Sequence, residues 1–222
     1  MNELKEILNS DWYLEFQKRH EERYKTVKVG DNIVHLSYLR GVVDNKDITE
    51  IEEYLKCSEL ELSLLDKHGL AQNALEDYMN VICICISTPL ISNILIGVLS
   101  SSVWDSIKFA VKKVWLNVRN KEYISLKAGS SEKKKITFGL EIKLDENTGF
   151  NFRLEGDISE ELVDRSLDKA LDFLKKQKMK KQKMNKHSYF MMYDADKKKW
   201  NKIDVEEELY KETMREKNRC KY

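Results

Sequence analysis

The sequence predicts an α+β fold, with N-terminal helices and a hairpin, a long apolar central helix, and a C-terminal β-hairpin plus helix module. Three observations carry this prediction. Apolar residues alternate with a period of two over 136–144 and 150–154, which is typical of strands. Apolar residues recur at helical spacing over 160–174. Residues 80–104 carry no charge in a chain that is 35% charged, so this run must be removed from water by a bilayer or by other protein.

Composition bounds the class of protein. The net charge of +1 argues against a globally basic nucleic-acid-binding protein and against a strongly acidic disordered one. Four scattered cysteines are too few for a disulfide framework, which favours a reducing, cytoplasmic compartment. The N-terminus is acidic from Glu3 and does not resemble a secretory signal. The predicted regions are 1–79, 80–120, 121–204 and a polar terminal helix within 205–222.

In the first region, apolar spacing over 4–16 predicts one or two surface helices. Residues 27–39 favour a β-hairpin around a turn at 30–32. Asp47 and Glu50 then form a capping-box-like helix start. The apolar stripe of this predicted helix consists of Ile51, Leu55, Leu62 and Leu65. The helix is expected to stop at Gly69, because glycine is common just after a helix C-terminus. A short helical segment over 71–79 leads into the uncharged run.

The uncharged run has two predicted parts. Residues 81–86 are rich in β-branched side chains and favour a buried strand or a helix end. A helix is expected from Pro89, capped by Thr88, to about Val118. Its apolar seam consists of Val103, Ile107, Ala110, Val114 and Val118, opposite Lys108, Lys112 and Lys113. A face of small residues at Asn93, Gly97 and Ser101, with Trp104 and Ile107, predicts close helix–helix contact with a partner.

The C-terminal region predicts a strand at 124–126, a hairpin over 136–154 with its turn at 145–149, and a helix that covers the apolar face of the hairpin. Asp157 caps this helix, with Glu160 at the third position. Its inner stripe consists of Leu162, Val163, Leu167, Ala170, Leu171 and Leu174. A last hairpin joins 189–193 to 199–203, and a polar helix is expected over 205–217.

A lysine run follows the covering helix. It consists of Lys175, Lys176, Lys178, Lys180, Lys181, Lys183 and Lys186, with no acidic residue between them. Binding to nucleic acid or to anionic lipid headgroups is one interpretation, and a solvated basic segment is the favoured one. Neither arginine nor interleaved aromatic residues accompany the lysines, as a nucleic-acid stacking surface would require.

No catalytic motif stands out. Glu141 and Lys143 match the E-x-K half of a restriction-type nuclease motif, but the metal chemistry also needs a second carboxylate, usually an aspartate, on a neighbouring strand. Residues 116–144 contain Glu122 and Glu132 upstream but no aspartate. Cys83 and Cys85 lie in an apolar setting with no nearby histidine in sequence, so they are interpreted as core thiols. No metal ligand set, phosphate loop or nucleophile elbow is predicted, and no cofactor is expected.

The segment Trp104-Asp105-Ser106-Ile107-Lys108 resembles the W-D-x-I-K-type segment of small uncharacterised bacterial proteins of defence and mobile-element loci. These proteins also join an apolar, Ser/Gly-bearing helix to a small β-β-α module. The resemblance covers roughly residues 89–203 and transfers no functional residues. It implies a role in a multi-protein antiviral system.

Three functional hypotheses follow. The first is a non-enzymatic interaction or assembly subunit, with a protein partner that is expected to be another copy of the chain. The second is a membrane-inserting effector at the inner membrane that uses 81–103, a run long enough to be considered as a span. The third is a metal-dependent nuclease that uses Glu141 and Lys143.

Overall fold

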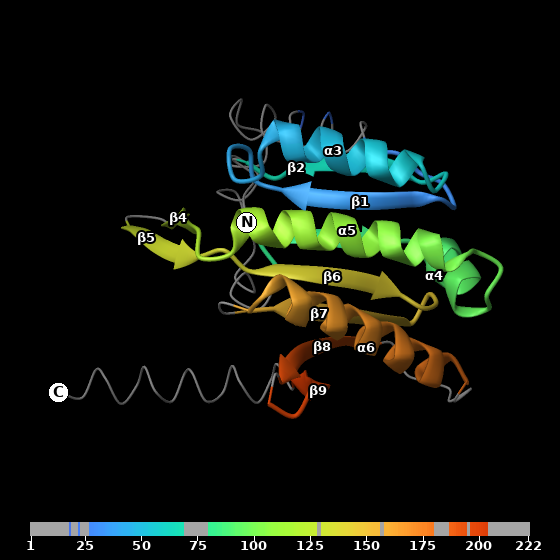
Figure 1. The fold of residues 1–222 in the computed structure, drawn as a ribbon. Coiled ribbons are helices and arrows are strands. Elements are labelled where there is room, and N and C mark those ends of the chain that lie inside the picture. Colours follow the sequence, from blue (N-terminus) through green and yellow to red (C-terminus); the bar gives the residue numbers. More distant parts are fainter. Residues whose placement is uncertain are drawn as a thin grey trace, which may run out of the picture.

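The computed structural model describes residues 27–68, 80–127, 130–155, 158–179, 187–194 and 196–203, together with residues 18 and 22. It shows a mixed α/β fold built on a seven-stranded sheet of order β2-β1-β3-β6-β7-β8-β9 (Figure 1). These strands are β1 (Ile33–Tyr38), β2 (Glu61–Asp66), β3 (Ile82–Ile86), β6 (Phe138–Lys143), β7 (Thr148–Leu154), β8 (His187–Asp194) and β9 (Lys199–Ile203). A separate pair consists of β4 (Glu122–Lys127) and β5 (Ser130–Lys135). The described helices are α3 (Asn45–Lys56), α4 (Thr88–Leu95), α5 (Ser101–Val118) and α6 (Glu160–Met179).

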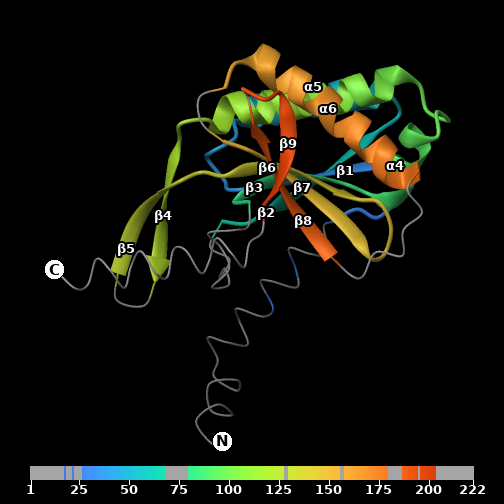
Figure 2. The same ribbon diagram turned by 90° about the horizontal axis from the view of Figure 1, so that it is seen from below.

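Three crossovers join parallel neighbours in the sheet: β1 to β2 through α3, β3 to β6 through α4 and α5, and β7 to β8 through α6. The helices cover one face of the sheet (Figures 1 and 2). Strands β1 and β7 point the same way, but their crossovers move toward opposite edges of the sheet. With their helices on one face, these two crossovers must have opposite hands. Figure 1 shows that β7–α6–β8 is the left-handed one, a rare arrangement.

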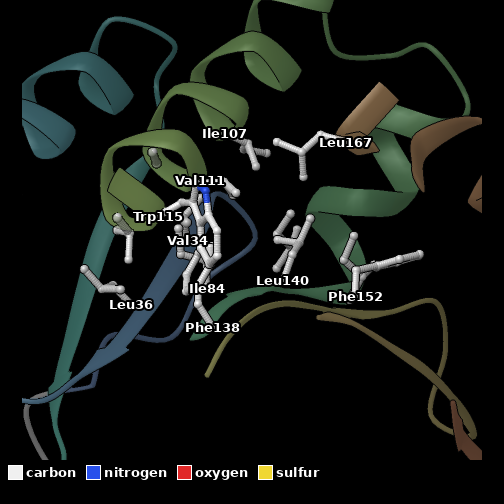
Figure 3. Close-up of a cluster of buried hydrophobic side chains, with 14 of the residues drawn as sticks. Val34, Leu36, Ile84, Ile107, Val111, Trp115, Phe138, Leu140, Phe152 and Leu167 are labelled. Atoms are coloured by element: carbon white, nitrogen blue, oxygen red, sulfur yellow. The ribbon is translucent and has the colours of Figure 1, made fainter. Parts of the chain in front are cut away.

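The core lies between this face of the sheet and the helices. Ile107, Val111 and Trp115 of α5 point toward Ile84 and the neighbouring side chains of the central strands (Figure 3). The predicted seam of α5 is confirmed, because each of its five apolar residues is buried. Leu167 of α6 is buried on the same side as the apolar side chains of β7. The hydrophobic burial of this face therefore fixes which side of every strand faces inward.

Two predictions for the first region are wrong. Residues 27–29 form no strand, and β1 pairs with β2 and β3 instead of closing a hairpin. The helix that starts near Asp47 ends at Lys56, and Leu62 and Leu65 lie in β2. Both leucines continue the spacing of Ile51 and Leu55 only because the turn between α3 and β2 is short. The backbone of that turn passes through Glu59, whose φ is 58°.

The single long helix predicted from residue 89 to about 118 is also wrong, because the structure divides it into α4 and α5. Gly97 has φ 75°, the left-handed conformation that ends helices at glycine. The amide of Val98 donates back to the carbonyl of Asn93, and Ser100 is the extended N-cap of α5. At the start of α4, Ser87 is the N-cap, and Thr88 and Pro89 occupy the first turn.

The uncharged run is sheltered mainly by polypeptide. Its first part is β3, the buried strand that was one of the two options, and Leu90, Ile91 and Ile94 of α4 are buried. Only the turn between α4 and α5 leaves large apolar side chains exposed, at Ile96 and Val98. Within the described ranges, no helix combines the length and the apolar character that a bilayer span requires.

In the C-terminal region the two hairpins and the covering helix are confirmed, but the predicted helix start is not. Glu160 is the first residue of α6 and not the third, and the Ser159 Oγ accepts from the amide of Leu162. Leu162 and Leu171 of the predicted stripe are only half-buried. β6 and β7 form an antiparallel hairpin, β8 and β9 form another, and the inner stripe of α6 is buried at Val163, Leu167, Ala170 and Leu174. The predicted helices at 4–16, 71–79 and 205–217, the stop at Gly69 and the cap at Asp157 lie outside the described residues.

The lysines on the outer side of α5 tie the three long helices together. The Lys113 Nζ lies 2.8 Å from the Glu50 Oε2 of α3, and the Lys112 Nζ lies 3.0 Å from the Asp164 Oδ1 of α6. The Lys108 Nζ lies 3.0 Å from Asp168, 3.2 Å from Asp105 and 3.7 Å from Asp164. Burial lowers the pKa of Lys108, but these carboxylates outweigh burial and hold its pKa above the ordinary value.

We expect Lys108→Met to lower the free energy of unfolding by about 1 kcal/mol, because three neighbouring carboxylates lose their shared cation. Urea denaturation measures the loss, which should shrink in high salt. Lys46→Met is the control, since Lys46 is exposed and has no ion-pair partner among the described residues. An equal loss in both variants would contradict the assignment.

Candidate functional site

The residues of the predicted interaction face do not share one helix face. Asn93 is half-buried on α4, Gly97 lies in the turn, and Ser101 is exposed at the start of α5. Trp104 and Ile107 are buried in the core of the chain itself. These five residues therefore form no single continuous helix face, because the break at Gly97 separates Asn93 from Ser101 and the core contains Trp104 and Ile107.

Part of the lysine run is visible at the end of α6. Lys175, Lys176 and Lys178 are exposed there, and the Lys178 Nζ donates to the Ser92 carbonyl oxygen at 3.3 Å. Lys180, Lys181, Lys183 and Lys186 lie outside the described residues. Basic residues at a helix C-terminus complement its dipole, which accounts for the described three.

A two-stranded arm is the first candidate site. β4 and β5 pair antiparallel with each other and project from the body of the molecule between α5 and β6 (Figure 2). In the part of the chain that the structure describes, neither strand pairs with the main sheet, so the outer edge of each is open. The sequence predicts β4 but not β5, because Ser130–Lys135 has no apolar residue to indicate a strand.

The two faces of the arm differ. On one face Ser125 is buried and Tyr123 and Lys134 are half-buried. On the other face Ile124 is 63% exposed and its cross-strand partner is Lys133. The exposure of this large β-branched side chain is unusual, because open strand edges attract a further strand and are usually protected by charged side chains.

The second candidate site lies on the face of the sheet opposite the helices, here called the polar face. Strand pairing places Ser63, His35, Cys85, Glu141 and Asn151 in one row across five strands. Cys83 lies one pleat away on the same strand as Cys85. All these side chains are polar or are thiols, whereas the next row on the helix face is apolar throughout.

Cys83, Cys85 and Glu141 form a compact group, here called the cysteine–glutamate cluster. The two Sγ atoms are 3.6 Å apart, and the Cys85 Sγ lies 3.4 Å from the Glu141 Oε2. One potential ligand atom from each of the three side chains lies within 4.8 Å of the others. Cys83 is buried, and the other two are half-buried.

A chain of amides orients Glu141. The Asn151 Nδ2 donates to the Glu141 Oε1 at 3.4 Å, and the Asn80 Nδ2 donates to the Asn151 Oδ1 at 2.6 Å. Asn80 lies over Gly139, where a Cβ atom would come within 2.0 Å of the Asn80 Nδ2. The absence of a side chain at Gly139 therefore makes room for the amide chain. This arrangement leaves Oε2 of Glu141 directed to Cys85.

The titration behaviour of the polar face argues against thiolate chemistry. The hydrogen bond with Cys83, burial and the negative charge of Glu141 all raise the pKa of the Cys85 thiol well above its ordinary value. A thiol that stays protonated at neutral pH is a weak nucleophile. Burial lowers the pKa of His35, which keeps its ring neutral and a nitrogen lone pair free.

The nuclease interpretation finds little support in this geometry. Glu141 lies beside two thiols, and it is the one carboxylate in the group of ligand atoms that the described residues bring together there. Lys143 is exposed farther along β6. Glu141 lies 56 positions after Cys85 in the sequence, so no local motif joins it to the two cysteines, and only the parallel pairing of β3 with β6 brings them together.

Comparison of the chain with family models, with curated proteins and with solved structures gives no match.

Proposed function

We propose that the chain is a non-enzymatic assembly subunit that pairs with a second copy of itself through the outer edge of β4. The observation that carries the proposal is the exposure of Ile124 on a projecting arm whose β4 edge is open within the described residues. Such an edge offers backbone donors and acceptors to another strand, and its side chains decide which strand is accepted. The antiviral setting implied by the sequence resemblance belongs to the same proposal as its biological context.

Charge favours β4 over β5 as the pairing edge. β4 carries one acidic and one basic residue, Glu122 and Lys127, so two copies can approach without net repulsion. β5 has the sequence SSEKKK, and its three lysines oppose a second copy. Lysine on an edge strand is a common protection against unwanted pairing. The arm therefore has one protected edge and one edge suited to a partner.

Symmetry restricts the register. Two identical antiparallel strands related by a two-fold axis place one residue opposite its own copy. Centring the axis on Ile124 pairs this exposed side chain with itself and buries both copies. The result is a four-stranded ribbon, β5-β4-β4-β5, across two chains. Six residues of edge bury less area than a standard interface of about 1,200–2,000 Å², so we expect a monomer–dimer equilibrium that depends on concentration.

We expect Ile124→Lys to abolish the dimer, because two ammonium groups would then lie directly opposite each other. Light scattering coupled to size-exclusion chromatography over a range of concentrations measures the mass. Val29→Lys is the matched control, because Val29 is 95% exposed outside the arm, and this variant should dimerise like the wild type. A wild-type protein that stays monomeric at all concentrations, or an Ile124→Lys variant of unchanged dimer mass, would overturn the proposal.

A cysteine trap tests the register. In a background with Cys57→Ser and Cys220→Ser, Ile124→Cys should give a disulfide-linked dimer under mild oxidation, since residue 124 lies opposite its own copy. Ser131→Cys on β5 is the control and should stay unlinked. If Ser125→Cys links and Ile124→Cys does not, the axis lies one residue further along β4.

A further inference from the structure

We propose that Cys83, Cys85 and Glu141, with His35 as the fourth ligand, bind a divalent cation of the zinc class on the polar face of the sheet. This site is independent of the β4 edge and of the proposed assembly. It would join β1, β3 and β6, which are three neighbouring strands in the centre of the sheet.

The spacing of the ligand atoms suits a tetrahedral ion. Zn–S bonds of about 2.3 Å and Zn–O bonds of about 2.0 Å at tetrahedral angles require S···S of about 3.8 Å and S···O of about 3.5 Å. The observed Sγ···Sγ distance is 3.6 Å and the Cys85 Sγ···Glu141 Oε2 distance is 3.4 Å. Two of the three distances between ligand atoms thus already match the edges of a coordination tetrahedron, and all three atoms lie within 4.8 Å of one another. On binding, each thiol would release its proton to solvent, and the two thiolates would become ligands.

His35 stands where a fourth ligand is needed. It is the cross-strand partner of Cys85 on β1, as Glu141 is on β6. Directly opposite residues in antiparallel strands have Cβ atoms only about 5 Å apart, so the His35 ring would reach the cluster by rotation of its side chain. The His35 ring has no hydrogen-bond partner among the described residues, and the rotation breaks no observed interaction.

The surroundings of Glu141 resemble the outer shell of a metal site. Asn151 holds one carboxylate oxygen, and Asn80 holds Asn151 in turn. Outer-shell hydrogen bonds of this kind orient the ligating oxygen and raise metal affinity. An ordinary strand surface needs no such chain, and Asn80 is itself buried, at 4% exposure. Mixed thiolate, imidazole and carboxylate ligands favour zinc over magnesium or calcium.

The test uses the full chain, purified without a histidine tag, with Zn²⁺ alone for affinity and Co²⁺ as the spectroscopic probe. We expect one ion per chain by elemental analysis, and a thiolate-to-cobalt charge-transfer band with the strong visible bands of a tetrahedral ion. Cys83→Ser should remove the charge-transfer intensity from one thiolate. Glu141→Gln, which keeps the shape of the side chain, should weaken Zn²⁺ binding by ~10-fold or more.

Cys57→Ser is the control, because Cys57 is exposed outside the cluster, and it should bind like the wild type. His35→Ala should keep the charge-transfer band but alter the visible bands. Less than one ion per chain in the wild type, unchanged binding in both Cys83→Ser and Glu141→Gln, or a Cys83–Cys85 disulfide in the freshly purified protein would overturn the proposal. Should Cys83→Ser fail to fold, as judged by circular dichroism, the Glu141→Gln result decides alone.

Discussion

Phe152→Ala is expected to lower the free energy of unfolding by about 3–5 kcal/mol, as deletion of a fully buried ring does elsewhere. Phe152 is 0% exposed in the centre of β7. The centroid of its ring lies 6.1 Å from the ring centroid of Phe173 on α6 and 4.9 Å from that of Trp200 on β9, and both pairs are edge-on. The ring thus fills the space where strand, covering helix and final hairpin meet, and the backbone of a sheet cannot collapse to close the cavity.

Equilibrium denaturation in urea, followed by circular dichroism, measures this loss. Val29→Ala is the control, because Val29 is 95% exposed and its truncation should change the free energy of unfolding by less than about 0.5 kcal/mol. If Phe152→Ala cost no more than Val29→Ala, the packing of α6 on β7 would have to be wrong. If only the slope of the transition changed, the variant would have altered the compactness of the denatured state.

The part of the fold that sequence predicted well is the part where contacts are local. The β6–β7 hairpin is followed directly by the helix that covers it, and Trp200 of the β8–β9 hairpin donates to the Ser166 carbonyl oxygen of that same helix. Period and turn residues therefore suffice to identify these three elements. The core seam of α5 was likewise predictable, because a single face of one helix carries all of it.

The wrong predictions concern elements whose structure depends on segments distant in the sequence or on the backbone conformation of one residue. β1 resembled half of a hairpin, but its partners are β2 and β3, which no local period reveals. The helix break at Gly97 depends on its left-handed φ, and the spacing of the small residues in the sequence does not predict that backbone conformation. The predicted interaction face assumed one continuous helix, so the structure does not place its residues on a single face.

Neither candidate site could be fully assembled from sequence. Ile124 was visible as a strand residue, but its exposure follows from the arm projecting from the body. Cys83 and Cys85 were expected to be core thiols, and Cys83 is indeed buried. Their alternation places them on the face away from the helices, and the registers with β1 and β6 bring His35 and Glu141 to them. The sequence contains cysteine, histidine and glutamate side chains, but only the order of the strands brings these four residues close together.

The second large effect is expected at Gly139. Gly139→Ala should lower the free energy of unfolding by about 2–3 kcal/mol, as overpacking of a buried site and loss of its hydrogen bonds do. The new Cβ would lie 2.0 Å from the Nδ2 and 2.6 Å from the Cγ of Asn80, and 2.8 Å from the Oδ1 of Asn151. Asn80 must therefore leave its place, which breaks its hydrogen bond to Asn151. The φ of Gly139 is not in the left-handed region, so backbone strain adds nothing to this loss.

A double-mutant cycle separates this cause from a general weakening of β6. Asn80→Ala alone should cost about 1 kcal/mol, because it removes one hydrogen bond together with an Oδ1 that has no partner among the described residues. With Asn80→Ala present, Gly139→Ala should cost about 1–2 kcal/mol less than in the wild type, because the nearest clash has gone. The contact with Asn151 keeps the rescue incomplete. Strictly additive losses in urea denaturation would show that Asn80 does not lie over Gly139. The amide chain that orients Glu141 would then have to be rejected with it.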